Sequence, residues 1–250
     1  MHPLSVVIIT FNEEQNIERC LDSVKSIADE IIILDSYSTD KTVEISKNKG
    51  AIVRQQKFLG HIQQKNAALS LASNNYVLCL DADETLGERL INSILEAKIN
   101  FSANAYFFNR CTNYCGHFIR NGSWYPDKKI RLFDKRIAKW GGVNPHDRIE
   151  LDGTDKTIQY LRGDILHYSY NTIEEHVTRN NHYTSISADA LNSMGVRSNW
   201  FKILIHPLWA FIHGYIIRLG FMDGFYGFVI AINSAHATFQ KYVKLYQLQH

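Results

Sequence analysis

Two aspartates stand one residue apart at the end of an apolar run, in the segment YVLCLDADE. The run Tyr76–Leu80 predicts a buried strand, which places Asp81 and Asp83 at its carboxyl end. Two carboxylates at this spacing can share a hard divalent cation such as Mg²⁺ or Mn²⁺, since these ions prefer oxygen ligands. Such a cation can bridge a diphosphate and neutralise its charge, so the segment predicts a metal-assisted phosphate site.

The same segment also fits other chemistry. Residues Asp81 to Thr85 satisfy the Asp-x-Asp-x-Thr pattern of haloacid-dehalogenase-like phosphatases, in which the first aspartate is the phosphoryl nucleophile. Those enzymes usually open with this motif, whereas here a long pattern of strands and helices precedes it, and no later acidic pair follows an apolar strand. A phosphatase, an inactive saccharide-binding module and a solvated acidic turn are the alternatives.

Strands and helices alternate around this motif. Short β-branched runs predict strands, and apolar residues at helical spacing predict helices. In chain order they are strand Leu4–Phe11, helix Gln15–Ile27, strand Glu30–Leu34, a helix ended by Gly50, strand Ala51–Arg54, helix His61–Ala72, strand Tyr76–Leu80 and helix Glu88–Lys98. This alternation predicts the α/β class with a doubly wound, mostly parallel sheet, in which ligands bind beyond the carboxyl ends of the strands.

Two further strands end in residues that should share this sheet edge with Asp81. They are Thr10, Phe11 and Glu13 after the first strand, and Asp35 and Ser36 after the second. The Asp35 carboxylate suits a hydrogen bond to a base or a ribose. Neither G-x-G-x-x-G nor a P-loop follows either strand, which disfavours dinucleotide and triphosphate ligands.

The pattern changes beyond Asn100. Predicted strands at Tyr106–Phe108, Lys129–Phe133 and Ile165–Tyr168 are separated by loops, and residues 172–194 predict a polar helix. The last fifty or so residues are rich in aromatic and branched side chains, but charged residues, histidines and Pro207 interrupt the apolar run that a membrane span would need. This favours an amphipathic segment at a membrane interface, and a helix packed on the domain or on a second subunit is the alternative.

Composition excludes several classes of function. The 250 residues carry a net charge of +2 with histidines neutral, which argues against the dense basic face of a nucleic-acid-binding protein. The four cysteines do not indicate a disulfide framework, and the apolar N-terminus lacks a basic leader and a cleavage site. We expect a protein of the cytoplasm that does not bind nucleic acid.

Three segments together resemble the GT-A glycosyltransferase family 2, whose members are inverting enzymes that use nucleotide-diphospho-sugars. They are SVVIITFNEEQNIERCLDSV, IILDSYSTDKT and LDADE. The resemblance implies that Thr10, Glu13 and Asp35 contact the nucleotide, with Phe11, Ser36 and Ala82 beside them. It also implies that Lys65 lies near the diphosphate, and that Asp81 and Asp83 form the metal motif, with Asp83 the direct ligand.

The resemblance also implies how the chain is divided. We expect a GT-A catalytic domain over residues 1–195, with a nucleotide-sugar half over 1–100 and an acceptor half over 101–195. A helical, membrane-associating tail over 196–250 follows. A homo-oligomer formed through this tail is the alternative use of its apolar surface.

A narrower resemblance covers the rest of the chain. The segments WYPDKKIRLF, NPHDRIE, ILHYSY and RLGFMDGFYGF look like a subgroup of bacterial enzymes that add hexose to an inner-core heptose of lipopolysaccharide. It implies UDP-glucose as donor, a lipid-linked saccharide as acceptor, and peripheral association with the inner face of the cytoplasmic membrane. That subgroup commonly has Glu where this chain has Asp147, which is a conservative departure.

Inverting transfer needs a general base that takes a proton from the acceptor hydroxyl. Asp147 is the first candidate and Glu150 the second, whereas a loop carboxylate paired with Arg148 is the structural alternative. His146 is a candidate hydrogen-bond donor to the acceptor or the donor phosphate. His167, at the end of a predicted strand, is a candidate third member of the metal site.

Aromatic and basic residues flank these candidates. Trp124 and Tyr125 lie in a predicted loop where their faces could stack on an acceptor sugar, although aromatic residues more often belong to a core. A basic run follows, which fits anionic acceptor phosphates, lipid headgroups or a solvated surface equally well. It consists of Lys128, Lys129, Arg131, Lys135 and Arg136.

Overall fold

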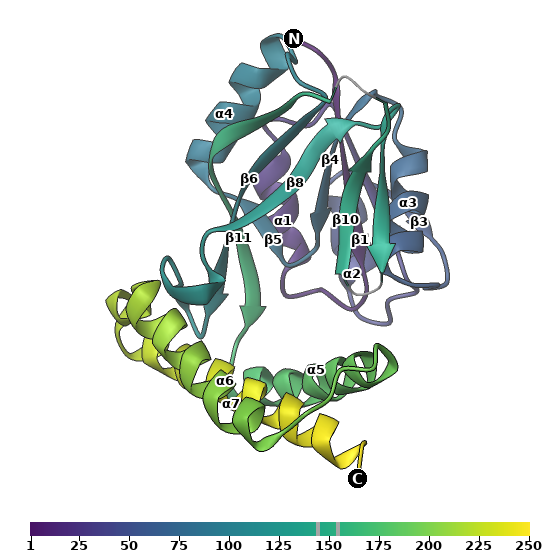
Figure 1. The fold of residues 1–250 in the computed structure, drawn as a ribbon. Helices are drawn as coiled ribbons and strands as arrows, with labels where there is room; N and C mark the ends of the chain where they lie inside the picture. The colour runs from purple at the N-terminus through teal and green to yellow at the C-terminus, as the bar shows by residue number, and fades with distance from the viewer. Residues whose placement is uncertain (144–145, 154–155) are drawn as a thin grey trace. The chain divides into compact units, whose positions relative to one another are not determined.

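The computed structural model describes residues 1–143, 146–153 and 156–250, and for Val143 and His146 it describes the backbone alone (Figure 1). By packing, the chain divides into two units. Unit 1 consists of Met1–Arg110 and Asp127–His167, and unit 2 of Cys111–Pro126 and Tyr168–His250. The sequence predicted a nucleotide-sugar half, an acceptor half and a tail, divided at residues 100 and 195. That division is defined by what each part binds, and it stays a prediction.

Unit 1 is built on a mixed sheet with the strand order β3-β2-β1-β4-β8-β6-β11-β5. Its first four strands are parallel and are β3 (Ile52–Gln55), β2 (Glu30–Asp35), β1 (Leu4–Thr10) and β4 (Tyr76–Asp81). The rest of the path consists of β8 (Asp127–Asp134), which runs antiparallel to β4, then β6 (Ala105–Tyr114), β11 (Ile158–Tyr170) and β5 (Glu84–Leu86). The predicted α/β class with a parallel first half is therefore confirmed.

Both faces of the parallel strands are buried, as their continuous apolar runs predict. On β1, Val6 and Ile8 face one core cluster, and Val7 faces the other. The helices that follow the strands are α1 (Ile17–Val24), α2 (Thr42–Asn48), α3 (His61–Leu71) and α4 (Glu88–Ile99). Residues of α1 and α4 pack in the first cluster and residues of α3 in the second, so helices cover opposite faces of the sheet (Figure 1).

A hairpin of β9 (Ala138–Val143) and β10 (His146–Leu151) lies where the sequence predicted a loop. Trp140 explains its position, because its ring is 4% exposed in the core cluster that α3 covers. Gly141 opposes Arg148, and a Cβ atom at Gly141 would stand 2.3 Å from a carboxylate oxygen of Glu150. The glycines Gly141 and Gly142 weaken the strand pattern in the sequence, which is why the hairpin was not predicted.

Unit 2 is mostly helical. Its elements are β7 (His117–Phe118), the 3₁₀ turns Gly122–Trp124 and Gly220–Asp223, α5 (Ile173–Ser193), α6 (Trp200–Phe211), a π-helical turn (Ile212–Ile217) and α7 (Gly224–Gln247). Side chains cap two helices as sequence rules expect, since Thr172 accepts a hydrogen bond from the Glu175 amide and Asn199 from the Lys202 amide. The polar helix predicted over 172–194 and the helical tail are both present.

Many large apolar side chains of α6 and its neighbours are exposed within unit 2. On α6 they are Trp200, Phe201, Leu204, Ile205, Leu208 and Trp209. By length and composition alone, the stretch Trp200–Ile217 is long and apolar enough to cross a membrane.

Candidate active site

Three predicted site residues reach one edge of the sheet. Thr10 pairs in register with Asp35, and Asp81 pairs with Ile9, so the parallel strands β1, β2 and β4 end side by side. This follows from the shared direction of the strands, and it gathers their terminal side chains at one place. The structure thus brings together residues that lie up to 71 positions apart in the chain.

The loops after β1 and β2 are tied to each other by hydrogen bonds. The carboxylate of Asp35 is fully buried and accepts hydrogen bonds from the Ser38 amide and hydroxyl and from Gln55 Nε2, the amide and Gln55 bonds each being 2.9 Å long. Asn12 in turn holds the Thr39 amide through its Oδ1 at 2.8 Å. Asp35 therefore shapes the loop, and its predicted contact with a nucleotide is untested.

Two aromatic side chains extend from these loops into solvent. Phe11 is 57% exposed and Tyr37 is 56% exposed. Phe11 was predicted to lie at the nucleotide, whereas Tyr37 was not. Their exposure leaves both rings free to stack on a flat ligand such as a base. Of the other predicted nucleotide residues, Thr10 and Ala82 are buried, Glu13 accepts a hydrogen bond from Asn16 Nδ2, and Ser36 Oγ accepts one from Gln64 Nε2.

Cations surround the Asp81 carboxylate. Arg131 Nη2 lies 3.0 Å from Asp81 Oδ2, and Lys65 Nζ lies 3.2 Å from Asp81 Oδ1. Burial alone would raise the pKa of Asp81, but the charges of Arg131 and Lys65 outweigh it and hold the pKa well below its usual range. Asp81 therefore stays ionised throughout the neutral pH range.

Glu84 is a buried partner of both Asp81 and Arg131. Its side chain is fully buried, its Oε2 accepts a hydrogen bond of 3.0 Å from the Asp81 amide, and its Oε1 lies 3.0 Å from Arg131 Nη2. The acidic pair Glu84 and Asp81 raises the pKa of Arg131 above its usual value against the opposing effect of burial. A buried cation bridging two carboxylates is a rigid support for Asp81.

The side chains of Asp83 and His167 contact each other. His167 Nε2 on β11 lies 3.1 Å from Asp83 Oδ2 in the turn between β4 and β5. The Nδ1 atom of His167 is buried, and no hydrogen-bond partner for it is found among the described residues. Two of the three residues predicted for the metal site, Asp83 and His167, therefore stand together, whereas the third, Asp81, is held by Lys65 and Arg131.

Asp83 and His167 offer a small donor set for a metal ion. Across the described part of the chain, no cluster of three histidine, cysteine or carboxylate side chains is placed to hold an ion. Asp83 and His167 supply one oxygen and one nitrogen, and Mg²⁺ commonly binds one or two protein carboxylates while water and phosphate oxygens fill the other positions. The residues present fit a divalent cation that a bound diphosphate helps to hold.

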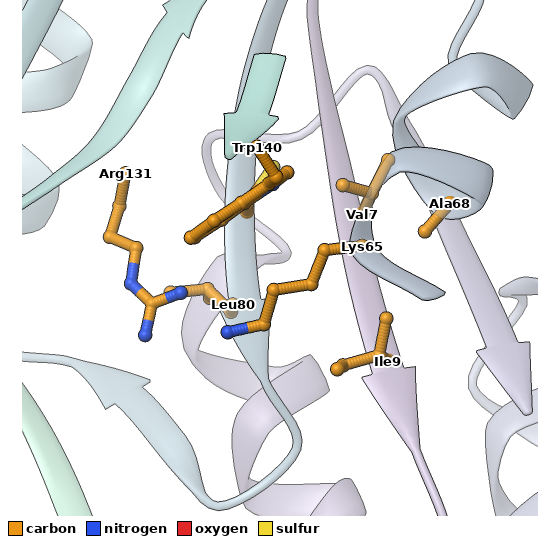
Figure 2. A pocket seen from close by; sticks show the side chains of 8 residues that line it. Val7, Ile9, Lys65, Ala68, Leu80, Arg131 and Trp140 are labelled. Carbon is orange, nitrogen blue, oxygen red and sulfur yellow. The ribbon is translucent and has the colours of Figure 1, made fainter. Parts of the chain in front are cut away.

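Lys65 joins the acidic motif to the first base candidate. Lys65 on α3 is nearly buried, and its Nζ lies 2.9 Å from Asp147 Oδ2 as well as beside Asp81. Figure 2 shows Lys65 and Arg131 directed toward one space near Leu80, with the ring of Trp140 beside them. Lys65 Nζ lies 4.5 Å from the centroid of that ring, and Arg131 Cζ lies 5.3 Å from it. The π face of Trp140 therefore makes cation–π contacts with both side chains.

A pocket of about 600 Å³ opens over this network within unit 1. Cations predominate along its wall, which consists of Lys65, Asp81, Arg110, Lys128, Lys129, Ile130, Arg131, Trp140, Asp147, Arg148 and Ile149. Glu150 does not line the pocket, and its Oε1 pairs with Arg148 Nη2 at 3.3 Å. The geometry therefore favours Asp147 over Glu150 as a base.

Two of the three predicted acceptor residues, Trp124 and Tyr125, have partners within unit 2. Trp124 belongs to unit 2, where its ring stacks on Tyr170 at 5.4 Å between centroids, and Tyr125 accepts a hydrogen bond from Arg218 through its carbonyl oxygen. The side chain of His146 lies outside the described part of the chain. Binding of an acceptor by these three residues stays a prediction.

Sequence reasoning missed the structural roles of Arg131, Glu84 and Trp140. Arg131 was assigned to a surface basic run, but it is 4% exposed. The available signal was its place inside the apolar strand segment Ile130–Phe133, where an arginine needs buried acidic partners. Lys135 and Arg136 of the same run bond to the Ala72 carbonyl and to Asp134, outside the pocket lining.

The fold and the site define an α/β protein with a polar ligand site at the carboxyl edge of a parallel sheet. Residues 5–150 match the model of glycosyl transferase family 2. An uncharacterized glycosyltransferase of Rickettsia typhi is 36% identical over 259 aligned residues that cover 99% of this chain and 88% of that protein. The chain therefore belongs to glycosyltransferase family 2, and it is a glycosyltransferase, as the sequence motifs predicted.

Two other similarities are more distant. The lipopolysaccharide core biosynthesis glycosyltransferase LpsC of Rhizobium meliloti is 26% identical over 258 residues, which cover 98% of this chain and 92% of LpsC. Glucosyl-3-phosphoglycerate synthase from Mycobacterium tuberculosis, in its complex with Mn²⁺, uridine diphosphate and glucosyl-3-phosphoglycerate, is similar with a TM-score of 0.38 and 23% identity. That similarity covers 45% of this chain and 44% of the synthase, and it carries no information about substrate.

Proposed function

We propose that this glycosyltransferase moves a hexose, glucose from UDP-glucose, with inversion onto a heptose of a lipid-linked lipopolysaccharide core. The contact of one ammonium group, that of Lys65, with both Asp81 and Asp147 carries the proposal. It means that the acidic motif expected at the donor diphosphate and the candidate base line the same pocket. The similarity to LpsC along nearly the whole chain supports the lipopolysaccharide core as the acceptor class.

The proposed reaction is a single displacement. Asp147 takes the proton of an acceptor hydroxyl, whose oxygen attacks the anomeric carbon from the face opposite the diphosphate. The bond from the anomeric carbon to the diphosphate oxygen breaks, and UDP leaves. For Asp147 to act, Lys65 has to turn from it toward the negative charge of the diphosphate, which its neighbouring contact with Asp81 allows.

Asp83 and His167 are the proposed protein ligands of a divalent cation. When bound, a cation there would neutralise the charge that develops on the departing diphosphate. For His167 to bind through Nε2, its Nδ1 has to carry the proton. The Asp83 carboxylate and the His167 ring already face each other at 3.1 Å, so little rearrangement of the protein is needed.

The exposed side chains of α6 are the proposed membrane contact of unit 2. Trp200 and Trp209 with nearby basic groups are typical of a segment at the boundary of lipid and water. Such a contact would bring the enzyme to a lipid-linked acceptor at the inner face of the cytoplasmic membrane. A homo-oligomer formed through the same residues is the competing proposal.

The test is transfer from UDP-glucose to a deacylated, heptose-containing core oligosaccharide in the presence of Mn²⁺, with the product analysed by NMR. We expect a β-linked glucose, since the donor is α-linked, and product formation at least about 10²-fold slower with Asp147→Asn. An α-linked product would overturn the inverting mechanism. Transfer from a different nucleotide sugar, with UDP-glucose inactive, would overturn the proposed donor while leaving the site intact.

A further inference from the structure

The cations of the pocket fall into an inner and an outer group. The inner group, Lys65 and Arg131, is nearly buried and faces the carboxylates of Asp81, Asp147 and Glu84. Arg110 also reaches Glu84 at 3.5 Å, so three cations face these three carboxylates and the inner group is close to neutral. This balance suits a divalent cation and a diphosphate, whose charges cancel each other.

The outer group has an excess of positive charge. We call it the outer rim, and its cations are Arg110, Lys128, Lys129 and Arg148. Asp127 pairs with Arg110 at 2.9 Å and with Lys129 at 3.1 Å, and Glu150 pairs with Arg148. Arg110 Nη1 also lies 3.5 Å from Glu84 Oε1 of the inner group, so Lys128, Lys129 and Arg148 against Asp127 and Glu150 leave one positive charge in the outer rim.

The excess charge lies on side chains that are open to a ligand. Lys128 is exposed, its Nζ lies 5.6 Å from the centroid of the Phe107 ring, and no carboxylate partner is found for it within the described part of the chain. Lys129 keeps 38% of its side chain exposed although it pairs with Asp127. The pair between Arg148 and Glu150 is weak because the Arg148 side chain is 74% exposed.

We propose that the outer rim binds an anionic group of the acceptor saccharide, a phosphate or a carboxylate close to the sugar that receives the hexose. This proposal rests on the proposed transferase function and names the chemistry of its acceptor. A phosphate or a carboxylate matches the excess positive charge of the outer rim. Lysine and arginine contacts to such groups are charge-assisted and therefore stronger than neutral hydrogen bonds.

The position of the outer rim assigns it to the acceptor and not to the donor. Lys128 and Lys129 pair with Asn109 and Phe108 of β6, on the side of β8 away from β4 and the other parallel strands. The predicted nucleotide residues Thr10 and Asp35 belong to β1 and β2 on the opposite side of β4. Asp81 ends β4, which lies between these two groups in the strand order, and Asp147 lines the same pocket from β10.

The test is calorimetric titration of the full chain, saturated with UDP and Mn²⁺, with three deacylated core oligosaccharides. The first is intact, the second has lost its phosphates, and the third has its carboxyl groups reduced. The protein variants are wild type, Lys128→Gln/Lys129→Gln and the control Lys25→Gln/Lys47→Gln. In the control, exposed Lys25 directly follows α1 and exposed Lys47 lies on α2, and neither lines the pocket. Affinity for UDP is measured separately for each variant.

We expect wild type and control to bind intact core at least about tenfold more tightly than one of the two modified cores, and the modified group identifies the anion. The Lys128→Gln/Lys129→Gln variant should bind intact core as weakly as wild type binds the modified one, with its affinity for UDP unchanged. Equal binding of all three cores by wild type would overturn this inference and leave the transferase function standing. A loss of UDP affinity in the variant would also overturn it, because the lysines would then serve the donor.

A second titration keeps the two proposals distinguishable if no core oligosaccharide binds. Mannose 6-phosphate and mannose are then added to the same complex with UDP and Mn²⁺. Binding of the phosphate ester alone, lost in Lys128→Gln/Lys129→Gln, would support the anionic subsite while contradicting the proposed heptose acceptor. Binding of neither sugar would overturn the anionic subsite.

Discussion

Lys65 Nζ lies 2.9 Å from Asp147 Oδ2, although the two residues are 82 positions apart and come from α3 and from the β9–β10 hairpin. The same Nζ contacts Asp81, so one ammonium group couples the acidic motif to the candidate base. Under the proposed function, the diphosphate of a bound donor would compete for this ammonium group. Donor binding would thereby free Asp147 for the acceptor hydroxyl, which implies that the donor binds first.

Replacement of the candidate base tests this coupling. Asp147→Asn should lower kcat about 10²- to 10⁴-fold, the usual contribution of a general base. Binding of UDP-glucose should be kept, because Asp81, Asp83 and His167 are unchanged. Glu150→Gln is the matched control, since Glu150 pairs with Arg148 and does not line the pocket, and it should keep kcat within a few-fold of wild type. A larger loss for Glu150→Gln than for Asp147→Asn would reverse the assignment of the base.

Arg131→Met should destabilise the protein. The substitution leaves Glu84 fully buried without its cation and removes a partner of Asp81, and breaking a buried ion pair in this way costs about 3–5 kcal/mol. The free energy of unfolding is measured by urea titration. Arg136→Gln is the control, because the Arg136 side chain is 61% exposed in its pair with Asp134, and it should cost no more than about 1 kcal/mol. Equal stability of the two variants would show that Arg131 does not hold the network together.

Unit 2 contains a histidine that should make stability fall in mild acid. His176 is 1% exposed, its Nδ1 lies 3.0 Å from the Tyr114 hydroxyl, and burial lowers its pKa to about 4. The folded state therefore keeps His176 neutral where the unfolded chain, with a histidine pKa of about 6.5, takes up a proton. The contribution of neutral His176 to the free energy of unfolding is complete above about pH 6.5. It is lost as the pH falls toward 4, at about 1.4 kcal/mol per pH unit.

Two histidine variants test whether His176 causes this pH dependence of stability. His176→Gln should unfold in urea with a weaker pH dependence between pH 6.5 and 4.5 than wild type has. His182→Gln, at an exposed position on the same helix α5, should keep the wild-type dependence. The same slope in wild type and His176→Gln would mean that His176 is not held neutral by burial.

The membrane contact is tested on α6. Leu204 and Leu208 are 61% and 55% exposed, so Leu204→Ser/Leu208→Ser should leave folding intact. Partition to anionic phospholipid vesicles, measured by sedimentation, should fall at least about tenfold, because each buried leucine contributes about 1.5–3 kcal/mol. Ile99→Ser, which removes an exposed apolar side chain of α4, is the control. Unchanged partition with conversion of a dimer to a monomer would favour the homo-oligomer instead.

The sequence predicted the edge of the site better than its interior. Thr10, Asp35 and Asp81 end parallel strands, and strand direction alone brings such residues together. The meeting of Asp83 and His167 was also predicted, although their 3.1 Å contact depends on β11 returning beside β5 and could not be derived from local pattern.

The network beneath the edge could not be predicted in the same way. Arg131 resembles its basic neighbours in the sequence, and only the pairing of β8 with β4 reveals that it faces Asp81 and Glu84. The hairpin that presents Asp147 contains Gly141 and Gly142, which obscure its strand pattern. Long-range pairing, not local propensity, decides the position of these residues.

We propose that Asp83 and His167 form a divalent-cation site for a nucleotide sugar. It is tested most directly by calorimetric binding of UDP and UDP-glucose, with and without Mn²⁺, to wild type, Asp83→Ala and the control Glu150→Gln. We predict that Mn²⁺ strengthens binding to wild type and to the control, and that Asp83→Ala loses this effect, weakening binding at least about tenfold. Absence of UDP binding to wild type, or the same Mn²⁺ dependence in Asp83→Ala, would contradict the claim.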